Sequence, residues 1–224
     1  MDLRAENISK RYFRRTGEAN NFMAVQPVSM TLRLGEITVL GGRSGSGKTT
    51  LLHMLSGLLT PTEGKVFLGG TELYALPDAA LSRLRNEKIA VIPQGRSAVE
   101  TLTVLENILL PGILYAGTDR QDTARKWMEV FGIDHLADTG TAELSGGELR
   151  RMAIARALTT DPDFLFADEP TGDLDDENTR LILSTLRSYA HEEGKSVFLV
   201  THEIEAEHYA DRFLIMDAGR IHGE

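Results

Sequence analysis

The chain has 224 residues, of which 42% are hydrophobic, and a formal net charge of -9 at pH 7. This length suits one compact α/β domain with a smaller lobe. The negative charge argues against a general nucleic-acid-binding surface, which needs clustered Lys and Arg, and the absence of cysteine excludes disulfides and thiolate metal sites.

The apolar runs of the sequence are short. Those at residues 89–92 and 197–200 fall far below the roughly 20 residues of a membrane-spanning helix. We therefore expect that the chain does not cross a bilayer by itself. Its first residues lead into a strand-like segment and not into the apolar region of a signal peptide.

The N-terminal part is predicted to be β structure. Residues 3–40 contain alternating and β-branched stretches, which are interrupted by a polar segment at residues 14–21. We expect an antiparallel β lobe with a hairpin loop at that polar segment.

A glycine-rich loop follows an apolar run at residues 37–40. Residues 42–49 read GRSGSGKT, which matches the pattern G-x-x-x-x-G-K-[ST]. Backbone N–H groups of such a loop curl around a β-phosphate, and a helix that begins at Lys48 adds the positive end of its dipole. We expect Lys48 to bridge the β- and γ-phosphates and the Thr49 hydroxyl to bind Mg²⁺. The other nucleotide contacts predicted in this segment are Gly42, Ser44, Gly45, Ser46, Gly47 and Thr50. The alternative is a chance glycine-rich turn before a helix.

Helical patterns dominate the middle of the chain. A turn at residues 60–64, a strand at 65–68 and a helix at 77–86 come first, and residues 94–160 then show helical periods at 104–110, 123–131 and 148–158. This change of pattern predicts an inserted helical lobe at about residues 95–160, within a single domain that spans residues 1–224.

A second glycine-containing motif, LSGGE, occupies residues 144–148. Ser145 and Glu148 have the spacing of a capping box, so a helix should begin here. Gly146 and Gly147 carry no side chains, which leaves the backbone of the first helical turn accessible. Such a helix start can receive an anion. An ordinary capped surface helix is the alternative for these residues taken alone.

Two acids stand at the end of an apolar strand. Residues 164–167 follow a turn at 161–163 and lead into Asp168 and Glu169. In a phosphate-loop protein the first acid, Asp168, would hold Mg²⁺ through water, and Glu169 would orient or deprotonate the attacking water. Capping of a helix by the two acids is the alternative.

The last pattern is a strand at residues 197–200 followed by His202, which can present an imidazole to a γ-phosphate. We take the other five histidines as structural. Residues 177–190 form a helix whose stripe of Ile182, Leu186 and Tyr189 should be buried. Strands that alternate with helices predict a mainly parallel sheet with its ligand at the carboxyl ends of the strands.

The ordered set GRSGSGKT, VIPQ, LSGGE, FLFADE, PTGDLD and VTH resembles the ATP-binding subunits of ABC transporters over nearly the whole chain. The resemblance implies an α/β fold with a P-loop NTPase core of the ABC type, ATP and Mg²⁺ as ligands, and ATP hydrolysis. It implies that Gln94 senses Mg²⁺ and nucleotide, that Asp175 is the acid of a loop beside the nucleotide, and that His202 is a switch histidine. It places Tyr12 where an aromatic ring stacks on adenine, with Phe13 as the neighbouring alternative.

The segments LTVLENILLP and DEPTGDLD are similar to the branch of lipoprotein-release, macrolide-export, antimicrobial-peptide-resistance and cell-division ATPases. This resemblance implies a head-to-tail dimer around two ATP molecules, formed by two copies or by a copy and a paralogue. It also implies a separately encoded membrane permease, through which the chain would meet the cytoplasmic face of the membrane. A regulatory ATPase of the cell-division type, which signals without transport, is the alternative.

Other classes have less support. A small-molecule phosphotransferase has no need for a second glycine-capped helix start, and chromosome-maintenance relatives carry long heptad insertions, which this sequence lacks. The sequence departs from the family pattern in three respects: Glu148 in place of the commoner Gln, Arg43 in the phosphate loop, and Gly95 with Arg96 after Gln94. Cargo and direction of transport are not specified by these motifs.

Overall fold

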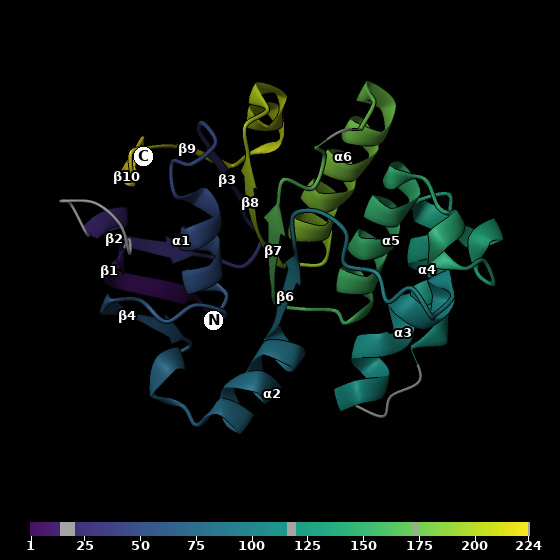
Figure 1. The fold of residues 1–224 in the computed structure, drawn as a ribbon, viewed down its shortest axis with the longest axis horizontal. Coiled ribbons are helices and arrows are strands. Elements are labelled where there is room, and N and C mark those ends of the chain that lie inside the picture. The colour runs from purple at the N-terminus through teal and green to yellow at the C-terminus, as the bar shows by residue number, and fades with distance from the viewer. Residues whose placement is uncertain (14–20, 116–119, 173, 224) are drawn as a thin grey trace.

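The structure, a computed structural model, describes residues 1–13, 21–115, 120–172 and 174–223. In this part of the chain the strands form two sheets (Figure 1). The four-stranded sheet has the order β2-β1-β4-β5; its strands are β1 (Leu3–Phe13), β2 (Asn21–Leu32), β4 (Glu63–Leu68) and β5 (Thr71–Glu72). All of its neighbouring strands are antiparallel, as predicted for the N-terminal lobe.

The six-stranded sheet has the order β10-β9-β3-β8-β7-β6. Its strands are β3 (Ile37–Gly41), β6 (Ile89–Ile92), β7 (Phe164–Asp168), β8 (Ser196–Thr201), β9 (Arg212–Asp217) and β10 (Arg220–His222). Only the pairing of β10 with β9 is antiparallel, which confirms the prediction of a mainly parallel sheet. The carboxyl ends of β3, β7 and β8 therefore meet at one edge.

The helices are α1 (Lys48–Leu55), α2 (Asp78–Lys88), α3 (Val104–Tyr115), α4 (Gln121–Val130), α5 (Gly146–Thr159) and α6 (Asp176–Glu192). Short 3₁₀ turns lie at η1 (Leu73–Ala75), η2 (Asp134–Leu136), η3 (Thr141–Glu143) and η4 (Ile204–Tyr209). Figure 1 shows α1 on one side of strands β6 to β8, and α5 and α6 on the other side.

Alternation along the strands explains why both faces of this sheet are covered. On β7, Phe164 and Phe166 pack with α1 and the antiparallel sheet, whereas Leu165 and Ala167 pack with the helices of the opposite face. Successive strand residues point to opposite faces, so a strand that is apolar throughout is buried on both sides. The sheet is thus held rigidly between two apolar layers, and its carboxyl edge can present polar groups.

The segment between β6 and β7 is helical, as predicted. In its described part the one β contact is an isolated bridge between Thr103 and Gly140. Trp127 of α4 packs edge-on against Tyr189 of α6, with ring centres 5.9 Å apart. This aromatic contact ties the helical segment to the body of the molecule. The predicted stripe on α6 is buried, with Ile182 and Leu186 at 0% exposure.

Several predicted boundaries differ from the structure. The helix predicted at residues 104–110 continues to Tyr115 with Pro111 inside it, whereas the prediction ended it before the proline. Strand β4 begins at Glu63, because Gly64, with φ of 84°, comes close to the backbone of Asn7 and keeps the pairing with β1. Asn21 pairs with Phe13 and belongs to β2, while residues 14–20 of the predicted loop lie outside the described residues.

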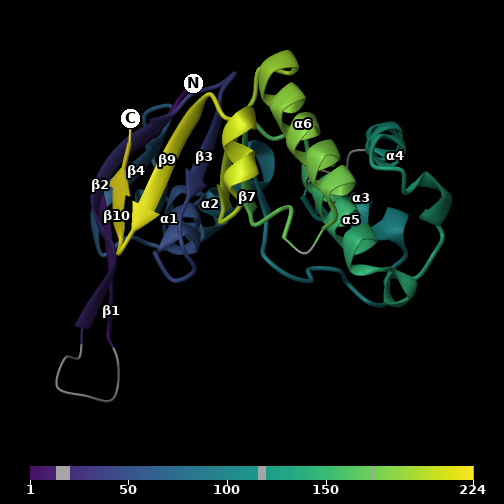
Figure 2. The same cartoon turned by 90° about the horizontal axis from the view of Figure 1, so that it is seen from above.

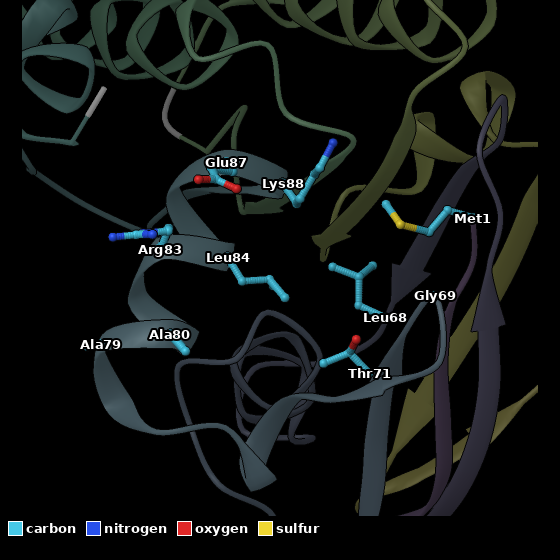
Figure 3. Close-up of a pocket in the computed structure, with 10 residues that line it drawn as sticks. All are labelled: Met1, Leu68, Gly69, Thr71, Ala79, Ala80, Arg83, Leu84, Glu87 and Lys88. Carbon is cyan, nitrogen blue, oxygen red and sulfur yellow. The ribbon is translucent and has the colours of Figure 1, made fainter. Parts of the chain in front are cut away.

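Helix α2 shifts to Asp78–Lys88, with Pro77 as its N-cap residue. Of the apolar face predicted for it, Leu81 is buried, but Ala80 is exposed. Ala80 and Leu84 instead line a hollow of about 570 Å³ between α2 and β4, where Figure 3 shows Leu84 and Leu68 pointing toward one another. None of the predicted site residues lines this hollow.

The two sheets meet beside β10. The backbone N–H of Gln26 on β2 donates to the carbonyl of Gly219, in the turn before β10, at 2.8 Å, and Figure 2 shows β10 next to β2. Every helix in the described ranges is too short or too polar to span a bilayer.

Candidate functional site

The glycine-rich loop between β3 and α1 is pressed against both sheets. A Cβ atom on Gly42 would lie 2.3 Å from the carbonyl oxygen of Met216 on β9, and one on Gly47 would lie 2.2 Å from that of Ala24 on β2. Both glycines have positive φ, 146° and 108°. Because such an approach to backbone leaves no room for a side chain, these positions must be glycine for the loop to take this shape.

The outer side of the same loop is open. No atom lies within 4 Å of the position of a Cβ atom on Gly45, and Ser44 is exposed. The hydroxyl of Ser46 is buried and, among the described residues, has no hydrogen-bond partner. An unpaired buried hydroxyl is costly, so this loop offers a donor and space to an anionic group. A phosphate fits both features.

Helix α1 begins at Lys48, as predicted, with Gly47 as its N-cap residue. The Lys48 ammonium is 6% exposed and donates to the carbonyl oxygens of Gly42, at 2.6 Å, and Arg43, at 3.2 Å. It also lies 3.8 Å from Oε1 of Glu169. Thr50 lies in the same first turn. The ammonium group therefore lies between the carbonyl groups of the loop and the acid that follows β7.

Thr49 and Asp168 form a pair of oxygen ligands. The Thr49 hydroxyl donates to Oδ1 of Asp168 at 3.2 Å. Asp168 ends β7 and is 2% exposed; burial raises the pKa of its carboxyl, and the Thr49 hydrogen bond only partly offsets this. Hydroxyl and carboxylate oxygens suit Mg²⁺. No cluster of three metal-binding side chains occurs in the described ranges, so the phosphate groups of a nucleotide and water would supply the other ligands.

Glu169 sits in a strained turn directly after β7. Its φ is 49°, which is rare for a residue with a side chain and typical of functional sites. Its N–H still donates to the carbonyl of Val200 at 2.9 Å, and its own carbonyl accepts from Gly172 at 3.2 Å. This tight turn directs the carboxylate toward the segment after β8.

His202 meets that carboxylate. Nδ1 of His202 lies 2.9 Å from Oε2 of Glu169, and the His202 backbone N–H donates to the same oxygen at 3.2 Å. The imidazole is 63% exposed. The structure thus brings together a cluster of predicted residues at the carboxyl edge of β3, β7 and β8: Lys48, Thr49, Asp168, Glu169 and His202. This set can hold a phosphate chain, a divalent cation and a reacting water.

The capping box predicted at the start of α5 is present. The Ser145 hydroxyl oxygen accepts from the N–H of Glu148 at 3.3 Å, and the Glu148 carboxylate accepts from the N–H of Ser145 at 2.8 Å. The hydrogen bonds from Ser145 lower the pKa of Glu148. Gly146 is exposed, and no atom lies within 4 Å of the position of its Cβ. Gly147 has only side-chain atoms of Leu174 and Arg151 near that position.

This motif lies apart from the cluster. Helices α1 and α5 stand on opposite sides of the central strands (Figure 1). Across the described ranges, no hydrogen bond or ion pair joins Ser145, Gly146 or Gly147 to the glycine-rich loop of the same chain. The two predicted phosphate-binding elements therefore do not form one site within a single molecule.

Asp175 acts as the N-cap of α6. Its carboxylate accepts from the N–H of Asn178 at 2.8 Å, and the bonds from Asn178 lower the pKa of Asp175. Arg151 of α5 donates to the side chain of Asn178 at 2.6 Å. Asp175 is thus tied to the start of α6 and, through Asn178, to the helix that carries the LSGGE motif.

Among the described residues, no hydrogen bond or ion pair joins Gln94 or Tyr12 to the cluster. Gln94 is exposed after β6. Tyr12 lies near the end of β1, where its ring stacks on Phe22 with centres 5.6 Å apart and Lys10 lies over it at 5.7 Å. Phe13, the alternative, is 76% exposed. Their predicted roles with Mg²⁺ and adenine stay predictions.

Two arginines of α5 make contacts that were not predicted from the sequence. Arg150 donates to the carbonyl of Pro93 at 2.9 Å, and Arg156 donates to the carbonyl of Ser97 at 2.7 Å and to its hydroxyl at 2.5 Å. Both arginines thereby hold the segment around Gln94 against α5. The only signal in the sequence was the basic stretch after LSGGE, which does not show its partners.

Comparison with known proteins gives consistent matches. A family model described as ABC transporter matches residues 25–172. The lipoprotein-releasing system ATP-binding protein LolD of Aquifex aeolicus (strain VF5) is 39% identical over 225 residues, which cover 99% of this chain and 96% of that protein. An uncharacterized ABC transporter ATP-binding protein of Thermotoga maritima is 40% identical over 203 residues, or 89% of this chain and 86% of that protein.

Solved structures of ABC transporter cassettes are also similar to this chain. The dimeric structure of MJ0796, a bacterial ABC transporter cassette, has a TM-score of 0.90 at 33% identity and covers 99% of this chain and 98% of that one. A dimeric structure of MJ0796 in a post-hydrolysis state, bound to ADP and Pi, has the same TM-score at 32% identity and the same coverage.

Proposed function

Because the chain belongs to the ABC transporter family of ATP-binding proteins, we propose that it binds and hydrolyses ATP as the ATP-binding subunit of a transporter. The observation that carries this proposal is the gathering of five residues at one sheet edge, where Thr49 contacts Asp168 and Glu169 contacts both Lys48 and His202. A post-hydrolysis structure of a similar cassette, bound to ADP and Pi, supports it. Residues 1–224 would act as one ATP-binding domain with a helical lobe at about residues 95–160.

The loop and Lys48 would bind the phosphate chain. Backbone N–H groups on the open side of the loop, the free hydroxyl of Ser46 and the ammonium of Lys48 supply donors and positive charge. Gly42, Ser44, Gly45, Gly47 and Thr50 complete the set of proposed contacts. Thr49 and Asp168 would hold Mg²⁺, which when bound neutralises charge on the β- and γ-phosphates.

Glu169 is the proposed base. Its carboxylate lies 2.9 Å from Nδ1 of His202 and 3.8 Å from Lys48, so those contacts must loosen before it can accept a proton from water. His202 would then donate to the γ-phosphate, and Lys48 would turn from the loop carbonyls to the phosphates. The products are ADP and phosphate.

The second half of each site is proposed to come from another copy. Gly146 is exposed and lies apart from the loop of its own chain, and the MJ0796 cassette forms a dimer. Two copies would pack head to tail, with Ser145, Gly146, Gly147 and Glu148 of one against the ATP of the other, Asp175 at the contact, and Gln94 near Mg²⁺. Tyr12 would stack on adenine.

Mixing two inactive variants tests this arrangement. Lys48→Ala keeps the LSGGE helix but loses phosphate binding, whereas Gly146→Asp keeps the loop but places a carboxylate at the helix start. Each variant alone should hydrolyse no ATP. Their mixture should regain activity, because one of the two sites in a mixed dimer contains an intact loop and an intact LSGGE helix. A mixture that stays inactive would contradict the shared site.

A membrane permease is the proposed partner. The exposed Ile113 and Leu114 on α3, each 65% exposed, support docking over the region of residues 96–114 beside Gln94. The similarity to LolD supports a role in lipoprotein release or related export, with the protein held at the cytoplasmic face through its partner. The regulatory alternative has no observation of its own in its favour. Arg96→Glu should leave ATPase activity of the isolated protein intact and impair transport; unchanged transport would argue against docking there.

A further inference from the structure

A pair of residues outside the catalytic cluster joins the two segments that carry Glu169 and His202. Thr171 follows β7, Glu203 follows β8, and the Thr171 hydroxyl donates to Oε2 of Glu203 at 2.5 Å. Thr171 is 1% exposed. A hydroxyl that donates to a carboxylate forms a charge-assisted hydrogen bond, which is stronger than a bond between neutral groups.

The sheet itself brings these two residues face to face. Asp168 pairs with Val200 in the last step of the parallel ladder between β7 and β8. Thr171 and Glu203 lie equally far beyond that pair along their two segments. Their contact therefore extends the alignment of the strands into the loops that hold the reacting groups.

Glu203 is also fixed through its backbone. Its N–H donates to the hydroxyl of Thr201 at 3.0 Å, and Thr201 is 0% exposed. Both neighbours of His202 are thus anchored, whereas the imidazole itself is 63% exposed. Because little packs around the ring, the position of the imidazole depends on the backbone path between these anchors and on its contact with Glu169.

We propose that Glu203 is a positioning residue that, together with Thr171, holds the His202 segment against the turn of Glu169. This inference rests on the proposed ATPase function. Glu169 must exchange its contact with His202 for one with water before it can accept a proton. The Thr171–Glu203 bond includes neither reacting group, so it persists through that exchange and keeps the imidazole within reach of the γ-phosphate.

Steady-state hydrolysis and nucleotide titration test the proposal. Thr171→Val and Glu203→Ala each remove the bond. Each should lower kcat about 10- to 100-fold, with KM for ATP and the Kd of a fluorescent ATP analogue changed less than about twofold, because a displaced catalytic group affects the transition state more than binding. The double variant should lose no more activity than the worse single variant, since both changes break one contact.

Conservative variants separate positioning from folding. Thr171→Ser keeps the hydroxyl, and Glu203→Gln keeps an oxygen acceptor without the charge, so both should retain most of the wild-type kcat. Glu205→Ala is the matched control: Glu205 is an exposed acid of the same segment, and its carboxylate makes no hydrogen bond or ion pair with a described residue. This control should behave as wild type.

The outcomes are distinguishable. Absence of ATP hydrolysis by the wild-type protein would contradict the proposed function itself. With an active wild type, full kcat in Glu203→Ala, losses that multiply in the double variant, or equal losses in Glu203→Gln and Glu203→Ala would each overturn the positioning role.

Discussion

Glu169 and His202 are in direct contact across two neighbouring strands: Oε2 of the acid lies 2.9 Å from Nδ1 of the histidine and also accepts the histidine N–H at 3.2 Å. Glu169 has a positive φ of 49° in the turn after β7, and the contact is made from this turn to the segment after β8. Before ATP binds, the proposed base therefore contacts the histidine that is proposed to donate a hydrogen bond to the γ-phosphate. Binding of ATP has to separate the two side chains.

Glu169→Gln should retain ATP binding but lower turnover by a factor of about a hundred or more, because the amide cannot accept a proton from water. An ATP-bound dimer should then accumulate. Phosphate release and light scattering in the presence of ATP measure the two effects. A fully active, monomeric variant would exclude both the assigned role and the dimer.

Asp168→Asn should weaken Mg²⁺-dependent hydrolysis, raising the Mg²⁺ concentration for half-maximal rate about 10- to 100-fold. The same change should stabilise the protein without nucleotide at pH 7. Burial raises the pKa of Asp168, so the folded state disfavours its charge at neutral pH. That cost falls as the pH drops through the raised pKa.

Thermal unfolding measured from pH 7 downward checks the second effect. The difference in Tm between Asp168→Asn and wild type should be largest near pH 7 and shrink in acid. Asp217→Asn, an exposed residue at the end of β9, is the control. Lower stability of Asp168→Asn at pH 7 would show that its ionised form is not penalised.

Asp211→Ala should destabilise the fold by about 1–2 kcal/mol at pH 7. Oδ2 of Asp211 accepts from the N–H of Ile37, at 2.8 Å, and contacts Nε2 of His191 at 2.9 Å. Burial acts to raise the pKa of Asp211, but these two partners outweigh it and lower the pKa. Its contribution to stability is therefore complete above the ordinary Asp pKa of about 3.9 and is lost as pH falls through the lowered pKa.

Urea unfolding of this variant and of Asp217→Ala, at neutral and acidic pH, measures that contribution. The gap between Asp211→Ala and wild type should close in acid, whereas Asp217→Ala should track wild type throughout. A gap that widens in acid would reverse the assigned sign.

Arg156→Lys should loosen the segment around Gln94. Arg156 gives two hydrogen bonds to Ser97, and an ammonium cannot reproduce the planar fork that makes both. We expect a loss of stability of about 1–3 kcal/mol and faster amide exchange around residues 93–97, with ATP binding retained. Arg83→Lys, at an exposed position of α2, is the control. Unchanged exchange in Arg156→Lys would mean that this segment is held by other contacts.

Features that depend on neighbours along the chain could be predicted from the sequence. The capping box of Ser145 and Glu148, the start of α1 at Lys48 and the strand before Asp168 all follow from residues within one or two turns of one another. The strand order could not be predicted in this way, because periodicity does not say that β8 lies between β3 and β7. Contacts such as Thr49 with Asp168 and Arg156 with Ser97 depend on that order.

Local signals also failed where tertiary packing overrode them. The helical period at residues 104–110 stopped before Pro111, yet α3 continues through this proline to Tyr115. Gly64 predicted a turn, yet it lies within β4, where its missing side chain permits a close approach to Asn7. The stacking of Tyr12 on Phe22 depends on a hairpin register that shifts at three places, which no local pattern indicates.

The phosphate loop owes its shape to carbonyl groups of Ala24 and Met216, which belong to different sheets. A graft that moved only β3, the loop and α1 into another scaffold would leave both carbonyls behind and would not reproduce the cradle. Substitutions that disrupt the contact between the sheets, for instance at Gln26 and Gly219, should accordingly weaken nucleotide affinity even though neither residue belongs to the loop.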